Sequence, residues 1–344
     1  MPTSLSYLLV TPHALRTGQF SAPLAPIFSA DSVHLAGAQV ISLTEAFIDD
    51  YSALLQKHSD LAASIECLKS EFALGSTNAL LLFFSGSDAA TAIHAALPPA
   101  WDPTLGIVAL DADEAAKALA LFYRHYKDSA AVESTEGADL ERSLILLKPD
   151  NWRTPSVQPA LILQLLASSG VSLIAAKVLQ MSVEDALDFY GPIKAPLTNR
   201  LAPRFGSQAK AVLEEHFGFS LDDEIEASLT EGVGSLAAER EFHEIIAYMS
   251  GNSPDTIPPE RYAEPGSAMT LALLYEGAEA VAKLRRVIGA TNPAKAAPGT
   301  VRKTFGNNIL ENTIHGSDSP ESTERESAIV GIRESTIARL LADR

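Results

Sequence analysis

The feature that most constrains the fold of this chain is an internal repeat within its 344 residues. Residues 8–17 (LLVTPHALRT) align with residues 145–154 (ILLKPDNWRT), and the two prolines are offset by 149 − 12 = 137 positions. Two further pairs of segments match in the same order, 33–40 with 171–178 and 81–86 with 272–277. A repeated supersecondary unit is expected to fold in the same way each time it occurs. Each half is therefore predicted to form strand, helix, strand, helix, strand and helix.

The segment between the two copies has a different composition. Residues 127–139 are rich in small and polar side chains, as a solvated linker would be. We therefore expect a first domain at residues 1–126, a linker at 127–140 and a second domain at 141–344.

Charge and cysteine content limit the classes of function. The chain carries 26 Lys and Arg against 43 Asp and Glu, a net charge of −17, which argues against a nucleic-acid partner but not against nucleotides. Cys67 is the only cysteine, so an intrachain disulfide is impossible and a reducing compartment is expected. The sequence shows neither a basic segment before an apolar run at its start nor an apolar stretch near the roughly 20 residues that span a bilayer. A cytoplasmic protein without membrane contact is the expectation.

A histidine lies in the segment 312–322 (NTIHGSDSPES), directly before Gly316 and Ser317. Ser319 and Pro320 are typical of the cap and first turn of a helix, and the start of a helix stabilises anions such as phosphates. A neutral imidazole is a competent nucleophile for phosphorus, and a nearby carboxylate can hold its tautomer. A single histidine is more often a surface or core residue, so the neighbouring motifs decide its interpretation.

These motifs resemble those of nucleoside diphosphate kinases. Segment 312–322 resembles the family's active-site signature, and residues 141–150 (ERSLILLKPD) resemble its first strand. Residues 289–293 (GATNP) and 297–302 (APGTVR) resemble its nucleotide-binding segment. The resemblance covers roughly residues 141–190 and 242–330. It implies an α/β (α+β) fold of two ferredoxin-like βαββαβ sandwiches with antiparallel sheets. It also implies ping-pong transfer of the terminal phosphoryl group from ATP or another nucleoside triphosphate to a nucleoside diphosphate.

The resemblance further implies the roles of individual residues. His315 would carry the phosphoryl group as a phosphohistidine, with Glu326 orienting its ring and Lys148 taking part in the catalysis. The remaining nucleotide-binding residues would be Lys148, Arg285 and Arg302 as phosphate-binding cations, together with Thr291, Tyr190, Asn312 and Phe242. Mg²⁺ is expected to bind mainly through the phosphates of the nucleotide, without a dedicated protein cage.

The second half departs from the family pattern in one region. Residues from about 191 to 240 form an insertion, in which we expect one helix at 207–217 and another at 222–229. The phenylalanine on which the family stacks the base falls at Glu241 in the alignment, one residue before Phe242. Either Phe242 takes this role after a shift of one residue, or base stacking is altered beside the insertion.

The first half lacks the chemistry of the second. In the alignment of the two halves, Thr11 stands in place of Lys148 and His94 in place of Arg285. Val108 is expected in place of His315. Valine cannot be phosphorylated, so the first half is interpreted as a degenerate copy that forms an intrachain pseudo-dimer with the second, in a protein that is itself a homo-oligomer. The alternative is that the whole chain is a non-catalytic nucleotide-binding or regulatory module on the same fold.

Overall fold

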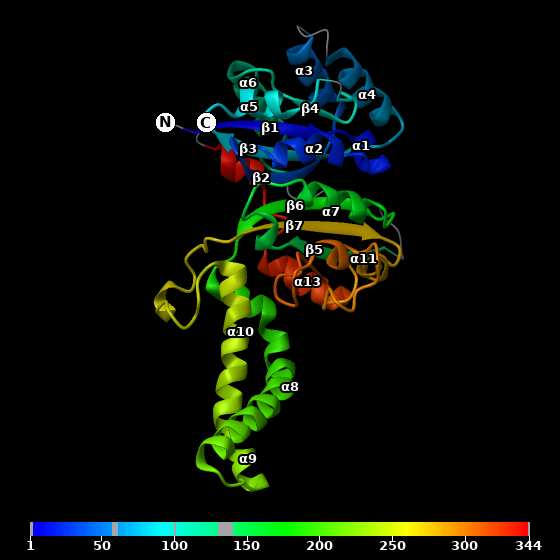
Figure 1. Cartoon of the computed structure of the whole chain (residues 1–344). Coiled ribbons are helices and arrows are strands. Elements are labelled where there is room, and N and C mark those ends of the chain that lie inside the picture. Colours follow the sequence, from blue (N-terminus) through cyan, green and yellow to red (C-terminus); the bar gives the residue numbers. More distant parts are fainter. Residues whose placement is uncertain (1–2, 57–60, 100, 130–139, 343–344) are drawn as a thin grey trace. The chain divides into compact units, whose positions relative to one another are not determined.

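The computed structural model describes residues 3–56, 61–99, 101–129 and 140–342, and the chain divides into two compact units (Figure 1). The first unit consists of Met1–Leu179 and Thr270–Arg344, and the second, a helical unit, is Gln180–Met269. Residues 130–139 of the expected linker lie outside the described residues. Both copies of the repeat contribute their sheets to the first unit, so the two halves are compact together.

The first half forms one four-stranded antiparallel sheet in the order β2-β3-β1-β4. Its elements are β1 (Ser4–Val10), α1 (Pro12–Thr17), α2 (Ser21–Phe28), β2 (Val33–Ser42), α3 (Glu45–Leu55), α4 (Ala62–Ala73), β3 (Asn78–Gly86), α5 (Ala89–Ala96), β4 (Gly106–Val108) and α6 (Ala112–Tyr126). Its largest core side chains are aromatic, and Tyr7 on β1 exchanges a hydrogen bond of 2.7 Å with Tyr51 on α3.

The second half repeats this arrangement, with the strand order β6-β7-β5-β8. Its elements in the first unit are β5 (Glu141–Leu147), the 3₁₀ turn η2 (Pro149–Asn151), α7 (Gln158–Ala167), β6 (Ser172–Gln180), β7 (Met269–Gly277), α11 (Ala280–Ile288), α12 (Val301–Phe305), β8 (Ile314–Gly316), α13 (Pro320–Ile329) and α14 (Thr336–Leu341). The central strand β5 is apolar on both faces and is buried from Ser143 to Leu147. The α+β fold with two antiparallel sheets, expected from the sequence, is confirmed.

The two halves of the repeat pack against each other within the first unit. Helices α2 and α7 lie side by side, and the ring of Phe28 contacts the ring of Trp152 edge-on at a centroid distance of 5.6 Å. The backbone N–H of Ser156 donates to the carbonyl of Phe28 at 3.0 Å. Polar and aromatic contacts therefore join the first half directly to the segment that follows β5.

The last helix of the second half completes the core of the first half. In α14, drawn in red in Figure 1, Ile337 and Leu341 belong to the same buried cluster as Tyr7 and Phe122. The backbone N–H of Ile337 also donates to Oε1 of Gln39 on β2 at 2.9 Å. Because the first half depends on side chains from the end of the chain, the two copies are structurally interdependent.

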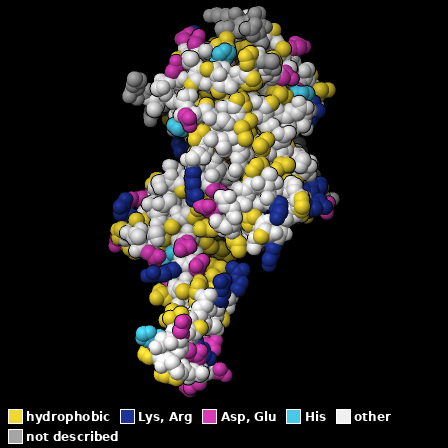
Figure 2. Space-filling model, viewed as in Figure 1, with side chains coloured by type: hydrophobic (Ala, Val, Ile, Leu, Met, Phe, Trp, Pro, Cys, Tyr) yellow, Lys and Arg dark blue, Asp and Glu magenta, His cyan; other side chains and the backbone are white. Residues whose placement is uncertain are grey.

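The helical unit is built on two long helices, α8 (Val183–Phe217) and α10 (Ser235–Ser250). Between them lie α9 (Asp223–Leu229) and a π-helical turn, η3 (Thr230–Gly234), while the 3₁₀ turn η4 (Pro259–Arg261) follows α10. The helix expected at 222–229 is confirmed, with Asp222 as its N-cap. Figure 2 shows that hydrophobic side chains remain visible on the surface of this unit.

Residues 207–217 are helical and end at Phe217 as expected, but they are the last turns of the longer helix α8 and not a helix of their own. The helix starts at a capping box between Ser182 and Asp185 and continues through three interior prolines. Proline is costly inside a helix, so tertiary packing has to compensate. The compensation comes from close contact with the opposite helix: a Cβ on Gly206 would lie 2.1 Å from Oγ1 of Thr230, and a Cβ on Gly234 would lie 2.2 Å from the carbonyl oxygen of Ala202.

Candidate active site

The histidine of the signature lies on β8, where its position pairs with Leu146 of the central strand β5. The Nε2 atom of His315 lies 2.8 Å from Oε2 of Glu326, a carboxylate that is only 5% exposed. The same Oε2 atom accepts a hydrogen bond of 2.7 Å from the hydroxyl of Ser317. A carboxylate in this position holds the proton of a neutral imidazole on Nε2 and places the lone pair on Nδ1.

Helix α13 places the carboxylate behind the histidine. The helix begins as the sequence indicates, with Ser319 as the N-cap and Pro320 at the first helical position. The Ser319 hydroxyl accepts a hydrogen bond from the backbone N–H of Ser322 at 3.1 Å. A capped start fixes the helix close to β8, so that Glu326, two turns further on, faces the strand.

The backbone immediately before the histidine is strained. Thr313 has φ = +66°, a left-handed conformation that β-branched residues avoid, and its side chain is buried. Three contacts hold it: its N–H donates to Oδ2 of Asp150 at 3.0 Å, and its carbonyl accepts from Lys148 N at 2.9 Å and from Asn151 Nδ2 at 2.7 Å. The Lys-Pro-Asp motif thus fixes the path of the chain into His315, a role that sequence reasoning missed.

Several predicted nucleotide-binding residues meet in one hydrogen-bonded network. The ammonium of Lys148 donates to Oδ1 of Asn312 at 3.0 Å and to the carbonyl of Leu310. The amide of Asn312 donates in turn to the carbonyl of Thr291 at 3.1 Å. Burial lowers the pKa of Lys148 to about 8. The lysine is therefore a buried cation whose charge would be stabilised by an anionic ligand.

The two predicted arginines approach the same region from different helices. Arg302 on α12 donates from Nη2 to the carbonyl of Ile314, the residue before His315, at 2.9 Å. Arg285 is exposed on α11. A hydrogen bond from the hydroxyl of Ser322, and then the charge of Arg285, lower the pKa of the Asp318 carboxyl. The structure therefore groups Lys148 and Arg302 around the strained turn, and Arg285 beside the start of α13.

Tyr190 and Phe242 belong to the helical unit, where they lie on α8 and α10. Tyr190 is 9% exposed and Phe242 is 1% exposed. The ammonium of Lys194 lies 5.6 Å from the centre of the Phe242 ring. A base could stack on this ring only if the side chain or its surroundings moved, so the base contact stays a prediction.

The site contains both cationic and carboxylate side chains. Among residues 3–56, 61–99, 101–129 and 140–342, no group of three or more His, Cys, Asp or Glu side chains could hold a metal ion. Asp318 contributes a carboxylate that accepts a hydrogen bond from Ser322 and is also influenced by the charge of Arg285. This donor set suits Mg²⁺ that arrives on phosphates, since magnesium is commonly held by one or two carboxylates together with phosphate oxygens and water.

Strand register identifies the counterpart of His315 in the first half. Leu9 pairs with Ile107 as Leu146 pairs with His315, and the two leucines are equivalent in the repeat. Ile107 therefore occupies the place of His315, and the expectation that Val108 does so was wrong by one residue. Both side chains are aliphatic, so the conclusion that the first half cannot form a phosphohistidine at this position is unchanged.

The groups that support the histidine are also absent from the first half. The same number of residues separates β4 from α6 and β8 from α13, so the alignment of the two halves continues without a gap. Ala109 and Ala118 then stand in the places of Ser317 and Glu326. Both alanines are fully buried beside Ile107 in the apolar core. The hydrogen-bonded set of the second half is replaced there by close-packed apolar side chains.

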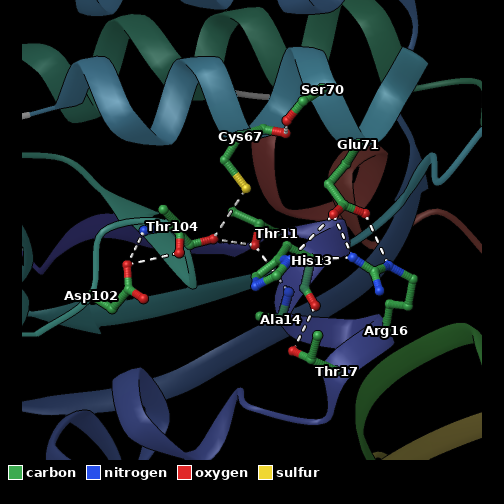
Figure 3. Close-up of polar contacts among 10 residues, drawn as sticks. All are labelled: Thr11, His13, Ala14, Arg16, Thr17, Cys67, Ser70, Glu71, Asp102 and Thr104. Atoms are coloured by element: carbon green, nitrogen blue, oxygen red, sulfur yellow. Dashed lines mark hydrogen bonds and ion pairs between the residues drawn. The ribbon is translucent and has the colours of Figure 1, made fainter. Parts of the chain in front are cut away.

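The remainder of the first-half site is closed by its own side chains (Figure 3). Thr11, in place of Lys148, donates from its hydroxyl to the carbonyl of Thr104 at 2.6 Å. Glu71 points from α4 toward α1 and accepts from Arg16 Nη2 at 2.7 Å, with His13 Nδ1 at 3.2 Å from the same carboxylate oxygen. The Arg16 guanidinium is the main cause of the lowered pKa of Glu71. A carboxylate thus pairs with the arginine that follows β1 in this half.

In the part of the chain that the structure describes, no helix combines the length and apolar character needed to cross a bilayer.

Comparison with known proteins gives a consistent result for the second half. Residues 262–334 match the family model of nucleoside diphosphate kinase. The nucleoside diphosphate kinase of Carboxydothermus hydrogenoformans is 52% identical over 63 residues, which cover 18% of this chain and 42% of that protein. The enzyme of the same name from Bdellovibrio bacteriovorus is 28% identical over 190 residues, covering 55% of this chain and 92% of that protein. In the shorter, more identical match the chain spans less than half of its relative.

Solved structures of similar proteins include the nucleoside diphosphate kinase of Encephalitozoon cuniculi in its apo form. It shares 22% sequence identity with a TM-score of 0.36, and the alignment covers 57% of this chain and 95% of that one. The enzyme from Aquifex aeolicus gives 23% identity and a TM-score of 0.34, covering 56% of this chain and 94% of that one. Residues 262–334 therefore match the nucleoside diphosphate kinase family, and the two antiparallel sheets show the α+β fold that was expected from the sequence.

Proposed function

We propose that the second half transfers the terminal phosphoryl group of a nucleoside triphosphate to a nucleoside diphosphate through a phosphohistidine at His315. The observation that carries the proposal is the contact of 2.8 Å between Nε2 of His315 and the buried carboxylate of Glu326. A buried carboxylate that also accepts from Ser317 is held in one orientation, so it keeps the imidazole in the tautomer that a nucleophile needs.

The reaction balances in two steps. In the first, Nδ1 of His315 forms a bond to the terminal phosphorus, the bond to the bridging oxygen breaks, and the nucleoside diphosphate leaves. The positive charge that develops on the imidazole is stabilised by Glu326. In the second step, a terminal phosphate oxygen of another nucleoside diphosphate attacks the same phosphorus, and His315 leaves as the neutral imidazole. One site therefore serves as acceptor and then as donor, which is ping-pong kinetics.

Cations of this site would hold and neutralise the transferred group. Phosphoryl transfer depends mainly on positioning and on charge stabilisation. Lys148 supplies a buried point charge, and the guanidinium groups of Arg285 and Arg302 can each grip two phosphate oxygens. Mg²⁺ bound to the nucleotide phosphates would neutralise further charge. Thr291, Tyr190, Asn312 and, after a local movement, Phe242 complete the set that we assign to the nucleotide.

The first half would act as the structural partner of the second in an intrachain pseudo-dimer. Its nucleophile position holds Ile107, and α2 packs on α7 while α14 enters its core. We therefore assign one active site to each polypeptide, in a first domain of 1–126 and a catalytic domain of 141–344 joined at 127–140. The single cysteine remains the basis for assigning the protein to the cytoplasm.

A labelling experiment tests the proposal. Incubation with a triphosphate labelled on its terminal phosphate and with Mg²⁺ should give an acid-labile, base-stable label on the protein. His315→Ala should abolish both the label and phosphate exchange while it leaves much of the nucleotide affinity, since the cations remain. His34→Ala, at an exposed position on β2, is the matched control and should keep full activity. Exchange at the wild-type rate in His315→Ala would refute the mechanism.

A second function is favoured by one observation. Phe242 is almost fully buried, so the base site beside the insertion differs from a freely accessible one. The chain could then be a nucleotide-binding or regulatory module that no longer catalyses transfer. Saturable binding of a nucleoside triphosphate without any label on the protein would support the module, and label on His315 would support the enzyme.

A further inference from the structure

Exposed hydrophobic side chains are concentrated on the helical unit. Seven of the twelve large hydrophobic side chains that are exposed among the described residues belong to it, although it makes up about a quarter of the chain. Two of them, Phe217 and Phe219, stack at a centroid distance of 5.9 Å and are each 59% exposed. Aromatic side chains exposed in this way are typical of a surface that is covered by a partner.

Charges of this unit are sharply segregated along the sequence. Residues 191–211, which we call the hairpin stem, contain four Lys and Arg and neither Asp nor Glu. Residues 212–233, which we call the hairpin tip, contain seven Asp and Glu and neither Lys nor Arg. Figure 2 shows blue side chains near the stem and magenta side chains at the far end. Within residues 191–233, the stem is therefore basic and the tip is acidic and aromatic.

Part of the stem charge is already used within the unit. Lys194 pairs with Glu239 at 2.8 Å, and Lys210 pairs with Glu226 at 2.9 Å. The two stem arginines, Arg200 and Arg204, are exposed and lie one helical turn apart, so they point from the same face of α8. They form a pair of guanidinium groups directed at solvent.

Dimensions of the helix allow the stem of one copy to meet the tip of another. From Arg204 to Phe217 the helix rises by about 20 Å at 1.5 Å per residue. In an isologous two-fold contact, residue i of one copy touches residue j of the other, and j touches i in return. Two hairpins side by side in opposite directions would therefore place each acidic tip on the other copy's stem, twice in every dimer.

We propose that this hairpin is a self-association surface, on which a second copy of this chain binds in the antiparallel direction with its tip against the stem arginines. A guanidinium group can stack on an aromatic face and pair with a carboxylate at the same time, which fits the pairing of Arg200 and Arg204 with the Phe217–Phe219 stack and the carboxylates of Asp223 and Glu224. The net charge of −17 opposes association through most of the surface, so a segregated patch of opposite sign decides where two copies meet. An acidic tip is also repelled by an anionic lipid surface.

Sedimentation velocity of the full-length chain and of charge-reversal variants tests the surface. Reversal of the stem (Arg200→Glu with Arg204→Glu) or of the tip (Asp223→Arg with Glu224→Arg) should each reduce the mass of the assembly by a factor of about two. The variant that combines all four changes should recover the wild-type mass, because the complementary charges are restored in exchanged positions. Lys69→Glu with Lys127→Glu, both at exposed positions in the first half, is the matched control and should leave the mass unchanged.

Equal masses in the wild type and in both reversals would overturn the proposal, and so would a combined variant that stays as light as the two reversals. Phosphate exchange is measured on each sample as an independent readout of folding, since none of the altered residues is assigned to the active site. A lighter assembly whose circular dichroism spectrum matches that of the wild type supports the surface whether or not the wild type exchanges phosphate, so failure here and failure of the proposed function are distinguishable.

A cross-linking experiment tests the direction of the contact. In a Cys67→Ser background, Arg204→Cys and Phe217→Cys are made on separate chains and then mixed. A cross-link should form between the two kinds of chain in the mixture and should be much weaker within either one alone. Preferential linkage between identical positions would show a parallel arrangement and would overturn the antiparallel one.

Discussion

Replacing Glu326 by Gln removes the charge behind His315, the nucleophile that we propose, and nearly preserves the shape of the side chain. The carboxylate contacts Nε2 of His315 at 2.8 Å and accepts from Ser317 at 2.7 Å in a site where it is 5% exposed. A hydrogen bond to a charged group contributes about 1.5–3 kcal/mol. If this stabilisation is realised as the imidazole becomes positive, its loss slows formation of the phosphohistidine by roughly 10- to 150-fold.

Rapid mixing of enzyme and labelled triphosphate, followed by quenching, measures this step directly. The fold should persist, because Ser317 can still donate to the carbonyl of Leu144, which lies 3.3 Å from its hydroxyl. Glu324→Gln is the matched control, since Glu324 is exposed on the same helix and should have a rate near that of the wild type. A Glu326→Gln rate within twofold of the wild type, or an equal loss in the control, would refute the assigned role.

Three further outcomes are expected. Burial lowers the pKa of Lys148 to about 8, so the lysine loses its charge as pH rises through that value. The kcat/KM for the nucleotide should therefore fall as pH rises above about 8. A pH profile of kcat/KM that stays level well above this pH would contradict the role of this cation. Ile107→His places a histidine at the position of the first half that corresponds to His315. The counterpart of Glu326 there is Ala118, so this histidine has no carboxylate to orient it, and intact-protein mass spectrometry should still find one phosphoryl group per chain. A second phosphoryl group would be the contrary result. Phe28→Ala removes a ring that packs on Trp152 between the two halves. It should lower the free energy of unfolding, measured in urea, by about 3 kcal/mol. A loss below about 1 kcal/mol would show that this contact contributes little to stability.

Local signals in the sequence were sufficient for the fold and for the starts of its helices. The repeat predicted two copies of one element order, and both sheets have equivalent strand orders. Ser319 and Pro320 begin their helix as expected, because capping depends on residues within one turn. Candidate phosphate-binding residues could be proposed for the same reason, since the motifs are short segments whose spacing is visible along the chain.

Alignment alone was not sufficient for register or helix length. The counterpart of His315 is Ile107, because a strand's register is set by hydrogen bonds to a partner about 100 residues away in the first half. Helix α8 is continuous through its prolines, because Gly206 and Gly234 let the opposite helix approach closely. Proline disfavours the interior of a helix, and packing between distant segments outweighs this local preference.

Sequence motifs determined which residues could carry the chemistry, and the tertiary structure decided how they are held. Asp150 lies in a recognisable motif, but its contact with the backbone of Thr313 joins positions 163 residues apart. The closure of the first-half site by Glu71, and the entry of α14 into the core of the other half, also depend on contacts between distant segments. Short-range preferences are encoded within a few residues of one another, whereas strain, burial and charge neutralisation arise only when remote parts of the chain are brought into contact.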